Sequence, residues 1–388
     1  MEPAPWVETL MPLPVLHVIA RLPVGGVEQQ LLTVVKHYDR ERFTPLVCSL
    51  SDKGPIGAEI ESAGIEVISL GSLRHTFSWA TVTALARVMS ERRVAVVRTH
   101  QYHANLYGRL AAIGARVPCV VASVHNAYTR DRKLHRRMIN YILSRFTDRV
   151  VAVSESVRHD VMKYDHLPGD KVIVIRNGID VEAFQSRDRS AVRSEFGIAD
   201  GVPVVGTVGR LTPQKGHHSL IEAFARLAPD FPAAILMVVG EGPLKEDLQG
   251  YAERLGVADR VIFAGLRRDI PQLLAAMDVF VLPSLWEGMP NALIEAMASG
   301  KAAITTDFAF AREIVNSDRL GILVPPQDSN AIARSVASLL RDATRSKRLG
   351  EAARENVRLQ FSITRTVDTY CSLFIEIMGQ KGINPVAR

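Results

Sequence analysis

Short apolar runs alternate with longer amphipathic stretches through most of the 388-residue sequence. The runs are apolar throughout rather than at every second position, as in strands that a parallel sheet buries on both faces. The stretches between them have the period of the helices that connect such strands. A first series of strands is predicted at 15–22, 43–50, 65–70, 94–100, 118–125 and 149–154, with helices at 28–37, 77–91, 104–113 and 132–145. This order indicates an α/β fold built on a parallel sheet.

A second series of the same kind begins near residue 172. Its strands are predicted at 172–177, 203–210, 233–240, 260–265, 278–284 and 301–307, and its helices at 217–228, 243–255, 270–277, 291–299 and 330–341. Chains of this length commonly form two domains. We therefore expect two doubly wound, Rossmann-like domains at 14–182 and 183–362, facing each other across a cleft. Residues 1–13 are expected to be a flexible segment, and 363–388 to be a helix that neither series requires.

The positive charge of the chain is concentrated in one segment. The net charge is +6, and the segment 130–149 sets seven basic residues against Asp131 and Asp148. These residues are Arg130, Arg132, Lys133, Arg136, Arg137, Arg145 and Arg149. The rest of the chain is close to neutral and does not interleave basic residues with aromatic ones. The composition therefore argues against a nucleic-acid-binding protein.

The same segment has an apolar side as well as a basic one. The apolar residues are Leu134, Met138, Ile139, Tyr141, Ile142 and Phe146. One interpretation is an interfacial helix attracted to an anionic lipid surface. The alternative is a solvated basic helix whose apolar side packs against the core.

Cysteine use and apolar run lengths indicate a cytoplasmic protein. Cys48, Cys119 and Cys371 are far apart and have no metal-ligand spacing, so we interpret them as buried free thiols. The first residues, MEPAPWVETLMPLP, lack the basic start and apolar core of a signal peptide. No apolar run approaches the ~20 residues that span a bilayer. We expect the protein in the cytoplasm, with peripheral attachment to the inner face of the membrane as an option.

The segment 283–300 combines a strand end, a loop and a helix start. A helix beginning near Asn291 directs its free N–H groups toward the end of the preceding strand, which favours a phosphate there. Pro290 suits a first helical turn, and Gly300 suits the helix end. Glu287 on the loop and Glu295 on the helix are predicted to accept hydrogen bonds from sugar hydroxyls. The alternative is that both are solvated surface acids.

A second segment, 209–216, supplies cations to a strand end. Arg210 follows the strand directly, and Lys215 precedes the next helix. Anions bind at the carboxyl ends of parallel strands. The chain has no Asp-x-Asp pair, the usual metal clamp on a nucleotide diphosphate, so we expect these cations to neutralise a diphosphate instead. The alternative is two loop cations exposed to water.

Together these segments resemble the retaining glycosyltransferases of the GT-B fold, specifically glycosyltransferase family 4 (glycosyl transferases group 1). The matching elements, in the family's order, are Gly209-Arg210, Lys215-Gly216, Gly240-Glu241-Gly242-Pro243, and Glu287-Gly288-Met289-Pro290-Asn291 leading to Glu295. The resemblance implies Arg210 and Lys215 on the donor diphosphate, Glu295 on the ribose and Glu287 on the sugar. It also implies that Phe263–Arg267, with Leu266, holds the base through backbone groups, and that the last helix crosses back onto the first domain.

The first half of the chain is expected to face the acceptor. Gly25-Gly26 follows the first strand, and its N–H groups can approach a ligand closely unless it is a plain turn. In the resembled family this loop lies near the donor phosphate. His125 matches the family's active-site histidine, whereas His100 and His103 are open to a packing or capping role.

The resemblance implies a hexosyltransferase that is retaining and independent of metal or cofactor. Its donor is expected to be a nucleotide-diphosphate sugar, with UDP favoured and GDP as the alternative. The acceptor is expected to be lipid-linked or a polysaccharide precursor for the cell surface. The sequence departs from the family at Phe308 and Phe310, where a Gly-Gly pair is common, which leaves the sugar open. Rival functions are a nucleotide-sugar epimerase and a catalytically silent relative.

Overall fold

The structure is a computed structural model that describes residues 12–73, 76–126, 134–185 and 188–383. The chain folds into two compact units, Met1–Gly178 with Ile363–Arg388, and Ile179–Ser362. The expected boundary after residue 182 is therefore a few residues late. The Ile179 N–H donates to the Phe361 carbonyl at 2.8 Å, which ties the start of the second unit to its end. The expected segment 1–13 lies almost wholly outside the described residues.

The first unit is built on a seven-stranded parallel sheet in the order β3-β2-β1-β4-β5-β6-β7. Its strands are β1 (Leu13–Ile19), β2 (Phe43–Ser49), β3 (Glu66–Ser69), β4 (Val96–His100), β5 (Cys119–Val124), β6 (Arg149–Ala152) and β7 (Val172–Val174). Each predicted strand of the first series is present; most are shorter than predicted, and β1 begins at Leu13 rather than at residue 15. The strand predicted at 172–177 to open the second series is β7 of this first sheet. The central strands are buried along most of their length, which explains their continuous apolar sequence.

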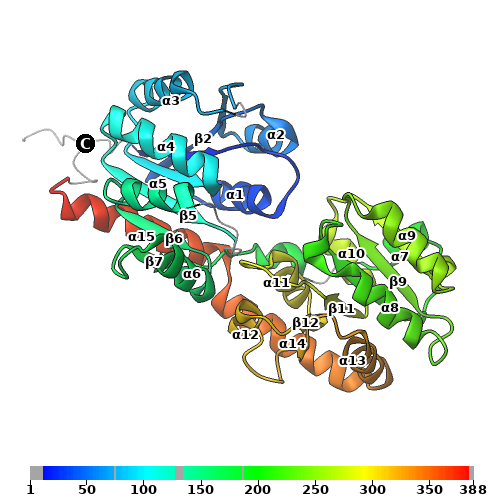
Figure 1. Ribbon diagram of the computed structural model, residues 1–388. Helices are drawn as coiled ribbons and strands as arrows, with labels where there is room; N and C mark the ends of the chain where they lie inside the picture. Colours follow the sequence, from blue (N-terminus) through cyan, green and yellow to red (C-terminus); the bar gives the residue numbers. More distant parts are fainter. Residues whose placement is uncertain (1–11, 74–75, 127–133, 186–187, 384–388) are drawn as a thin grey trace, which may run out of the picture. The chain divides into compact units, whose positions relative to one another are not determined.

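Helices cover both faces of this sheet (Figure 1). They are α1 (Gly26–Lys36), α2 (Gly54–Ser62), α3 (Trp79–Glu91), α4 (Gln101–Ala115), α5 (Leu134–Ser144), α6 (Glu155–Asp165) and α15 (Ile363–Gln380). One core contains residues of α1, α2 and α15, and the core on the opposite face contains residues of α3 and α4. The final helix, red in Figure 1, therefore completes the first unit although it is last in the chain.

The second unit has a six-stranded parallel sheet in the order β10-β9-β8-β11-β12-β13. The strands are β8 (Val204–Val208), β9 (Ile235–Val239), β10 (Val261–Gly265), β11 (Val279–Leu282), β12 (Ala302–Thr306) and β13 (Ile322–Val324). The α-helices are α7 (Ser190–Glu195), α8 (His217–Leu227), α9 (Lys245–Arg254), α10 (Ile270–Ala276), α11 (Asn291–Ala298), α12 (Ala309–Ile314), α13 (Ser329–Arg341) and α14 (Ala343–Gln360). Short 3₁₀ turns are η1 (Val181–Phe184), η2 (Pro213–Lys215) and η3 (Ala258–Arg260).

Strand order reverses at an equivalent place in each sheet. In the first unit the chain moves outward from β1 on one side and from β4 on the other, and in the second unit from β8 and β11. The loops that follow two such strands run in opposite directions and leave a crevice between them. Ligands of doubly wound sheets bind in this crevice, at the carboxyl ends of the strands. The segments singled out above follow these strands.

The structure of the basic segment 130–149 contradicts one of the two interpretations given above, the packing of its apolar side against the core. Arg130, Arg132 and Lys133 lie outside the described residues, but α5 and the turn after it are described. The exposed large apolar side chains there are Leu134, Met138, Tyr141, Ile142 and Phe146. α5 instead buries Asn140, Leu143 and Ser144. The apolar side of this helix is therefore largely uncovered, and the packing of that side against the core was the wrong expectation.

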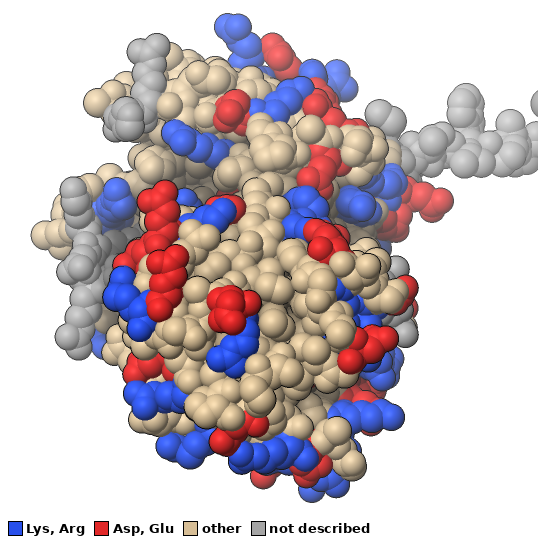
Figure 2. Space-filling view, turned by 90° about the vertical axis from the view of Figure 1, so that its right-hand side faces the viewer, with Lys and Arg blue, Asp and Glu red and all other residues tan. Residues whose placement is uncertain are grey.

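Other surface and core features match the composition. Lys and Arg side chains lie interspersed with Asp and Glu side chains on the face shown in Figure 2. Cys48, Cys119 and Cys371 are buried and unpaired. Within the described ranges, every helix is too short or too polar to cross a bilayer.

Candidate functional site

The loops after β8 and β11 meet at the strand reversal of the second unit. The Leu285 N–H donates to the Gln214 carbonyl at 2.8 Å, and Gln214 Nε2 donates to the Trp286 carbonyl at 2.8 Å. The two predicted segments, 209–216 and 283–300, are thus joined by hydrogen bonds to the backbone. Two regions far apart in the sequence therefore form one structure.

Two glycines allow the loop after β8 to pack backbone against backbone on its neighbours, the loops after β11 and β9. Gly216 has φ +64°, and a Cβ there would collide with the Pro283 carbonyl oxygen. Gly240 has φ +139°, and its Cβ would collide with the Gly209 carbonyl oxygen. Both conformations favour glycine, and any larger residue would push the loops apart. The loops can therefore approach closely only because these two residues are glycines. This is a structural reason for the glycines in the motifs Lys215-Gly216 and Gly240-Glu241-Gly242.

The charged centre of this half is a buried ion pair between Lys215 and Glu287. Lys215 Nζ lies 2.5 Å from Glu287 Oε1, with side-chain exposures of 18% and 8%. The Ser284 hydroxyl donates to the same carboxylate oxygen at 2.8 Å. The aliphatic part of Lys215 lies beside Gly209. The sequence indicated Lys215 on a diphosphate and Glu287 on a sugar, but it did not predict this ion pair between them.

Glu295, on the second turn of α11, is the second acid of the group. Burial raises the pKa of its carboxyl to about 7, an effect that the charge of Lys215 partly offsets. The carboxyl is therefore partly protonated near neutral pH. Hydroxyl groups of a ligand would stabilise its ionised form by donating hydrogen bonds to it. The charge of Lys215 thus acts on both acids, by an ion pair with Glu287 and electrostatically on Glu295.

Arg210 differs from Lys215 in having no partner. Its side chain is exposed, and it forms no ion pair or hydrogen bond among the described residues. A guanidinium binds a phosphate through paired N–H groups.

α11 begins at Asn291, with Pro290 at the N-cap position and Met289 buried before it. Gly300 has φ +69° directly after the helix, as predicted for its end.

The segment expected to hold a base is only partly available through its side chains. Arg267 is bound to Glu195 and Asp269, with Nη2 to Asp269 Oδ2 at 2.7 Å. Leu266 is 55% exposed, whereas Phe263 packs against the core. These positions leave backbone groups and Leu266 for a ligand.

The structure shows where Phe308 and Phe310, which stand in place of the family's common Gly-Gly pair, direct their bulk. The Phe310 side chain is fully buried, and it lies in the first turn of α12. Phe308 is the N-cap residue of that helix and is partly exposed. The two residues therefore do not act alike, and Phe310 fills the core.

The first unit contains a row of three buried histidines across neighbouring strands. His17 Nδ1 lies 3.1 Å from His100 Nε2, and His100 Nδ1 lies 3.1 Å from His125 Nε2. At the far end, His17 Nε2 lies 3.2 Å from the Tyr38 hydroxyl. His100 is thus part of the same hydrogen-bonded row as His125, whereas His103 lies outside it. We call His17, His100 and His125 the histidine row.

A buried arginine sets the charge of this region. Arg98 is 2% exposed and donates to the Tyr370 hydroxyl of α15 at 2.6 Å and to Ser123 Oγ at 3.0 Å. Its guanidinium also lies over the Tyr370 ring, 3.6 Å from the centroid, and no acid pairs with it within the described chain. Burial and this charge lower the pKa of His125 to about 3. They lower the pKa values of the other two imidazoles as well, so the row stays neutral.

The direction of the hydrogen bonds follows from Tyr38. Its hydroxyl is buried, and His17 Nε2 is the acceptor that it contacts in the described chain. An undonated buried hydroxyl hydrogen costs about 1–3 kcal/mol, so we propose that Tyr38 donates to His17 and that the undonated hydrogen lies at the other end of the row, where a ligand can accept it. Each neutral imidazole then accepts at Nε2 and donates at Nδ1. Within the described residues, the Nδ1 of His125 is buried without a hydrogen-bond partner, so in this direction the row ends in an N–H group that can donate to a ligand.

The first turn of α1, directly after Gly25, carries an acid, Glu28, that no sequence motif singled out. Gly25 is the N-cap residue of α1, and a Cβ there would collide with the Glu28 carboxylate. Gln101 donates to Glu28 at 3.3 Å, and burial raises the pKa of this carboxyl. Gln101 directly follows His100, so the Gly25-Gly26 loop lies beside the histidine row.

Five residues of this half were missed: His17, Glu28, Tyr38, Arg98 and Tyr370. His17 and Arg98 had a usable signal, because both are polar residues inside apolar strands. Tyr38 and Tyr370 had none, since each lies in a segment where an aromatic residue is ordinary. Within the described ranges, no group of three or more His, Cys, Asp and Glu side chains is arranged to hold a metal.

Comparison with known proteins identifies relatives of the whole chain. The family description "Glycosyl transferases group 1" matches residues 188–356, and "Glycosyltransferase Family 4" matches 24–183. The chain is 27% identical to UDP-Gal:alpha-D-GlcNAc-diphosphoundecaprenol alpha-1,3-galactosyltransferase of Escherichia coli, over 94% of this chain and 97% of that protein. It is 31% identical to alpha-maltose-1-phosphate synthase of Mycolicibacterium smegmatis, over 72% and 78%. The crystal structure of Anabaena Alr3699/HepE in complex with UDP and glucose has the same fold, with a TM-score of 0.85, 24% identity, and coverage of 94% and 100%.

The direction of the histidine row is open to measurement. In protein labelled with ¹⁵N-histidine, we expect the His125 signals to report a protonated Nδ1 and an unprotonated Nε2. Tyr38→Phe removes the hydroxyl that orients the row, so the opposite tautomer should become populated. A wild-type His125 protonated at Nε2 would contradict the assignment.

The carboxyl of Glu295 should make stability depend on pH. A raised pKa favours the protonated form in the fold, so this stabilising effect is present at low pH and is lost as the pH rises through about 7. Wild type should lose stability relative to Glu295→Gln between about pH 5 and about pH 8. Urea unfolding of both proteins across this range measures the effect, and parallel curves would refute it.

Proposed function

This chain belongs to the group 1 glycosyltransferases of the family 4 type, with the GT-B fold, and from that premise we propose that it transfers a hexose from UDP-hexose to a lipid-linked acceptor. In this proposal the configuration at the anomeric carbon is retained and no metal ion takes part. The donor binds the second unit and the acceptor the first. GDP is the alternative nucleotide.

The observation that carries the proposal is the placement of Lys215 with Glu287 and near Glu295. Lys215 and Arg210 neutralise the donor diphosphate, which the N–H groups at the start of α11 also approach. Glu295 accepts hydrogen bonds from the ribose, and Glu287 from the hexose. The backbone of Phe263–Arg267 holds the base.

The reaction proceeds by attack on the face from which the diphosphate leaves. The bond between the anomeric carbon and the phosphate oxygen breaks, and a bond to the acceptor oxygen forms. The proton of the acceptor hydroxyl passes to the departing phosphate oxygen. Arg210 and Lys215 stabilise the negative charge that develops on the diphosphate.

His125 acts as a neutral hydrogen-bond donor in this scheme. Its pKa of about 3 prevents it from supplying a proton as an imidazolium at neutral pH. The N–H at Nδ1 can instead donate to a hydroxyl of the donor sugar, and the Gly25-Gly26 loop supplies further N–H groups. Glu28 and Gln101 then hold this loop beside the histidine row.

Two features support a lipid-linked acceptor. The name of the Escherichia coli relative, which matches 94% of this chain, specifies a sugar on diphosphoundecaprenol as acceptor. α5 has a largely exposed apolar side together with basic residues. We propose that the segment 130–149 attaches the protein to the inner face of the membrane, in cell-surface glycan synthesis. Sedimentation with anionic vesicles in low salt tests the attachment, and absence of binding would contradict it.

Removal of either cation should slow transfer. Arg210→Ala is the sharper variant, because Arg210 is exposed and unpaired among the described residues, so stability should not change. Its turnover with a UDP-hexose should fall at least ~10²-fold. Arg319→Ala, which also removes an exposed arginine of the second unit, is the matched control and should retain wild-type turnover.

Lys215→Ala should cause a loss at least as large, about 10²-fold or more. It also leaves Glu287 buried without its cation, which destabilises a fold by about 3–5 kcal/mol. Thermal unfolding therefore accompanies the assay, to separate loss of folding from loss of turnover. Nearly normal turnover in both folded variants would exclude the assigned roles.

A further inference from the structure

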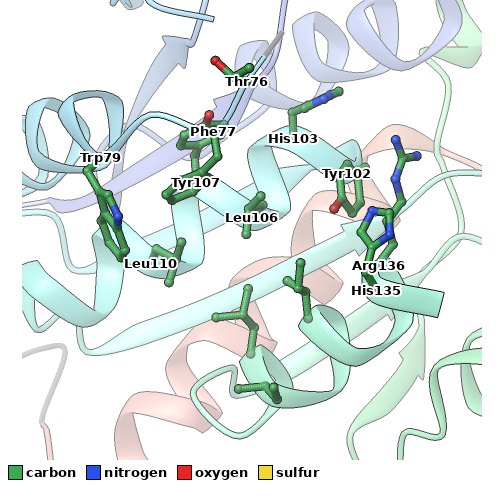
Figure 3. Close-up of a pocket in the computed structure, with 13 residues that line it drawn as sticks. Thr76, Phe77, Trp79, Tyr102, His103, Leu106, Tyr107, Leu110, His135 and Arg136 are labelled. Atoms are coloured by element: carbon green, nitrogen blue, oxygen red, sulfur yellow. The ribbon is translucent and has the colours of Figure 1, made fainter. Parts of the chain in front are cut away.

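A groove in the first unit lies among α3, α4 and α5 (Figure 3). Its volume is about 570 Å³, within the range of small-molecule sites. No sequence motif predicted it, because its walls come from three separate segments. The sequence pattern of α5 indicated only an apolar surface.

The walls of the groove are mainly apolar. Leu106 and Leu110 of α4 line it together with Ile139 and Ile142 of α5, and Phe77 stacks on Tyr107 at 5.3 Å. Trp79 at the start of α3 is 66% exposed, and Ile142 is 50% exposed. Burial of such surface is favourable by about 25 cal/mol per Å². The groove is therefore suited to a hydrocarbon rather than to a sugar.

One end of the groove is polar and basic. Figure 3 shows Trp79 and Leu110 at one end and Tyr102, His135 and Arg136 at the other. The guanidinium of Arg136 lies over the Tyr102 ring, 4.4 Å from the centroid. Its Nε is buried with no hydrogen-bond partner, and no acid pairs with it in the described chain. A half-buried cation without an acid partner in the described chain, at the end of an apolar groove, complements an anionic head group.

The polar end lies next to the histidine row. Tyr102 and His103 occupy the first turn of α4, which begins directly after His100. The apolar wall continues along the same helix through Leu106 to Leu110. A molecule with its anionic group at Arg136 would therefore have its hydrocarbon chain directed away from the row.

We propose that this groove holds the part of the acceptor's hydrocarbon chain nearest its phosphate, with the phosphate bound by Arg136. The inference rests on the proposed lipid-linked acceptor and adds its binding site. The ligand class is a single-chain isoprenoid or alkyl phosphate. A membrane surface alone would contact the exposed side of α5 without filling the groove.

Farnesyl diphosphate tests the proposal by calorimetry, with farnesol and inorganic diphosphate as its separate halves. Wild type should bind the complete molecule more tightly than either half. Ile142→Glu places a charge on the apolar wall, and Arg136→Gln removes the cation while keeping most of the side chain. Each should weaken binding by at least about tenfold.

Ile113→Glu is the matched control, because Ile113 is an exposed apolar residue of α4 that does not line the groove. It should bind as wild type does, and UDP should bind all variants equally, since its proposed residues lie in the second unit. The proposal would be overturned if Ile142→Glu and Arg136→Gln bound farnesyl diphosphate as tightly as wild type. It would also be overturned if the protein bound lipid vesicles but not farnesyl diphosphate. Binding of farnesyl diphosphate without transfer to any lipid acceptor would leave the groove intact and reject the proposed function instead.

Discussion

The ion pair between Lys215 and Glu287 is the interaction on which the second unit's site depends. It joins the loops after β8 and β11, the two strands where the sheet reverses direction. Both partners are largely buried, so neither can lose the other without leaving an uncompensated charge. A bound diphosphate would be the natural second anion for Lys215, and Arg210 has no competing partner in the described chain. The pair therefore holds the two loops together, while Arg210 is exposed and is proposed to bind the diphosphate.

The first unit, in contrast to the second, buries a cation that has no acid partner in the described chain. Arg98 is buried with no acid to pair with among the described residues, and it is held by the hydroxyl and ring of Tyr370. Burial together with this charge keeps the histidine row neutral, and we propose that the neutral row transmits one hydrogen-bond direction from Tyr38 to His125. Tyr370 belongs to α15, so the helix at the end of the chain stabilises a group at the centre of the first sheet. The crossing of that helix thus has a chemical consequence as well as a packing one.

Much of the fold could be predicted from the sequence because buried parallel strands have a distinctive pattern. β13 and several helices, among them α2, α6 and α14, were missed: β13 is only three residues long, and α14 buries few large apolar residues. Gly350 of α14 packs so closely on the Gly300 carbonyl that a Cβ would collide with it. Close backbone packing of this kind leaves no apolar period for a sequence pattern to detect.

The residues of the candidate site likewise fall into those that a sequence pattern could propose and those that it could not. The sequence could propose Arg210 and Lys215 because a short motif fixes their spacing on the loop after β8. A second motif does the same for Glu287 on the loop after β11 and Glu295 on α11. His17, Arg98 and Tyr38 could not be proposed in this way, because their contacts link strands and helices distant in the sequence. The direction in which His125 donates depends on those contacts and not on the residues beside it.

Calorimetric binding of UDP and of uridine, each with and without EDTA, tests most directly whether protein cations recognise the diphosphate. We expect UDP to bind equally well with EDTA and far more tightly than uridine. Loss of UDP binding on addition of EDTA, or equal affinity for uridine, would contradict this recognition.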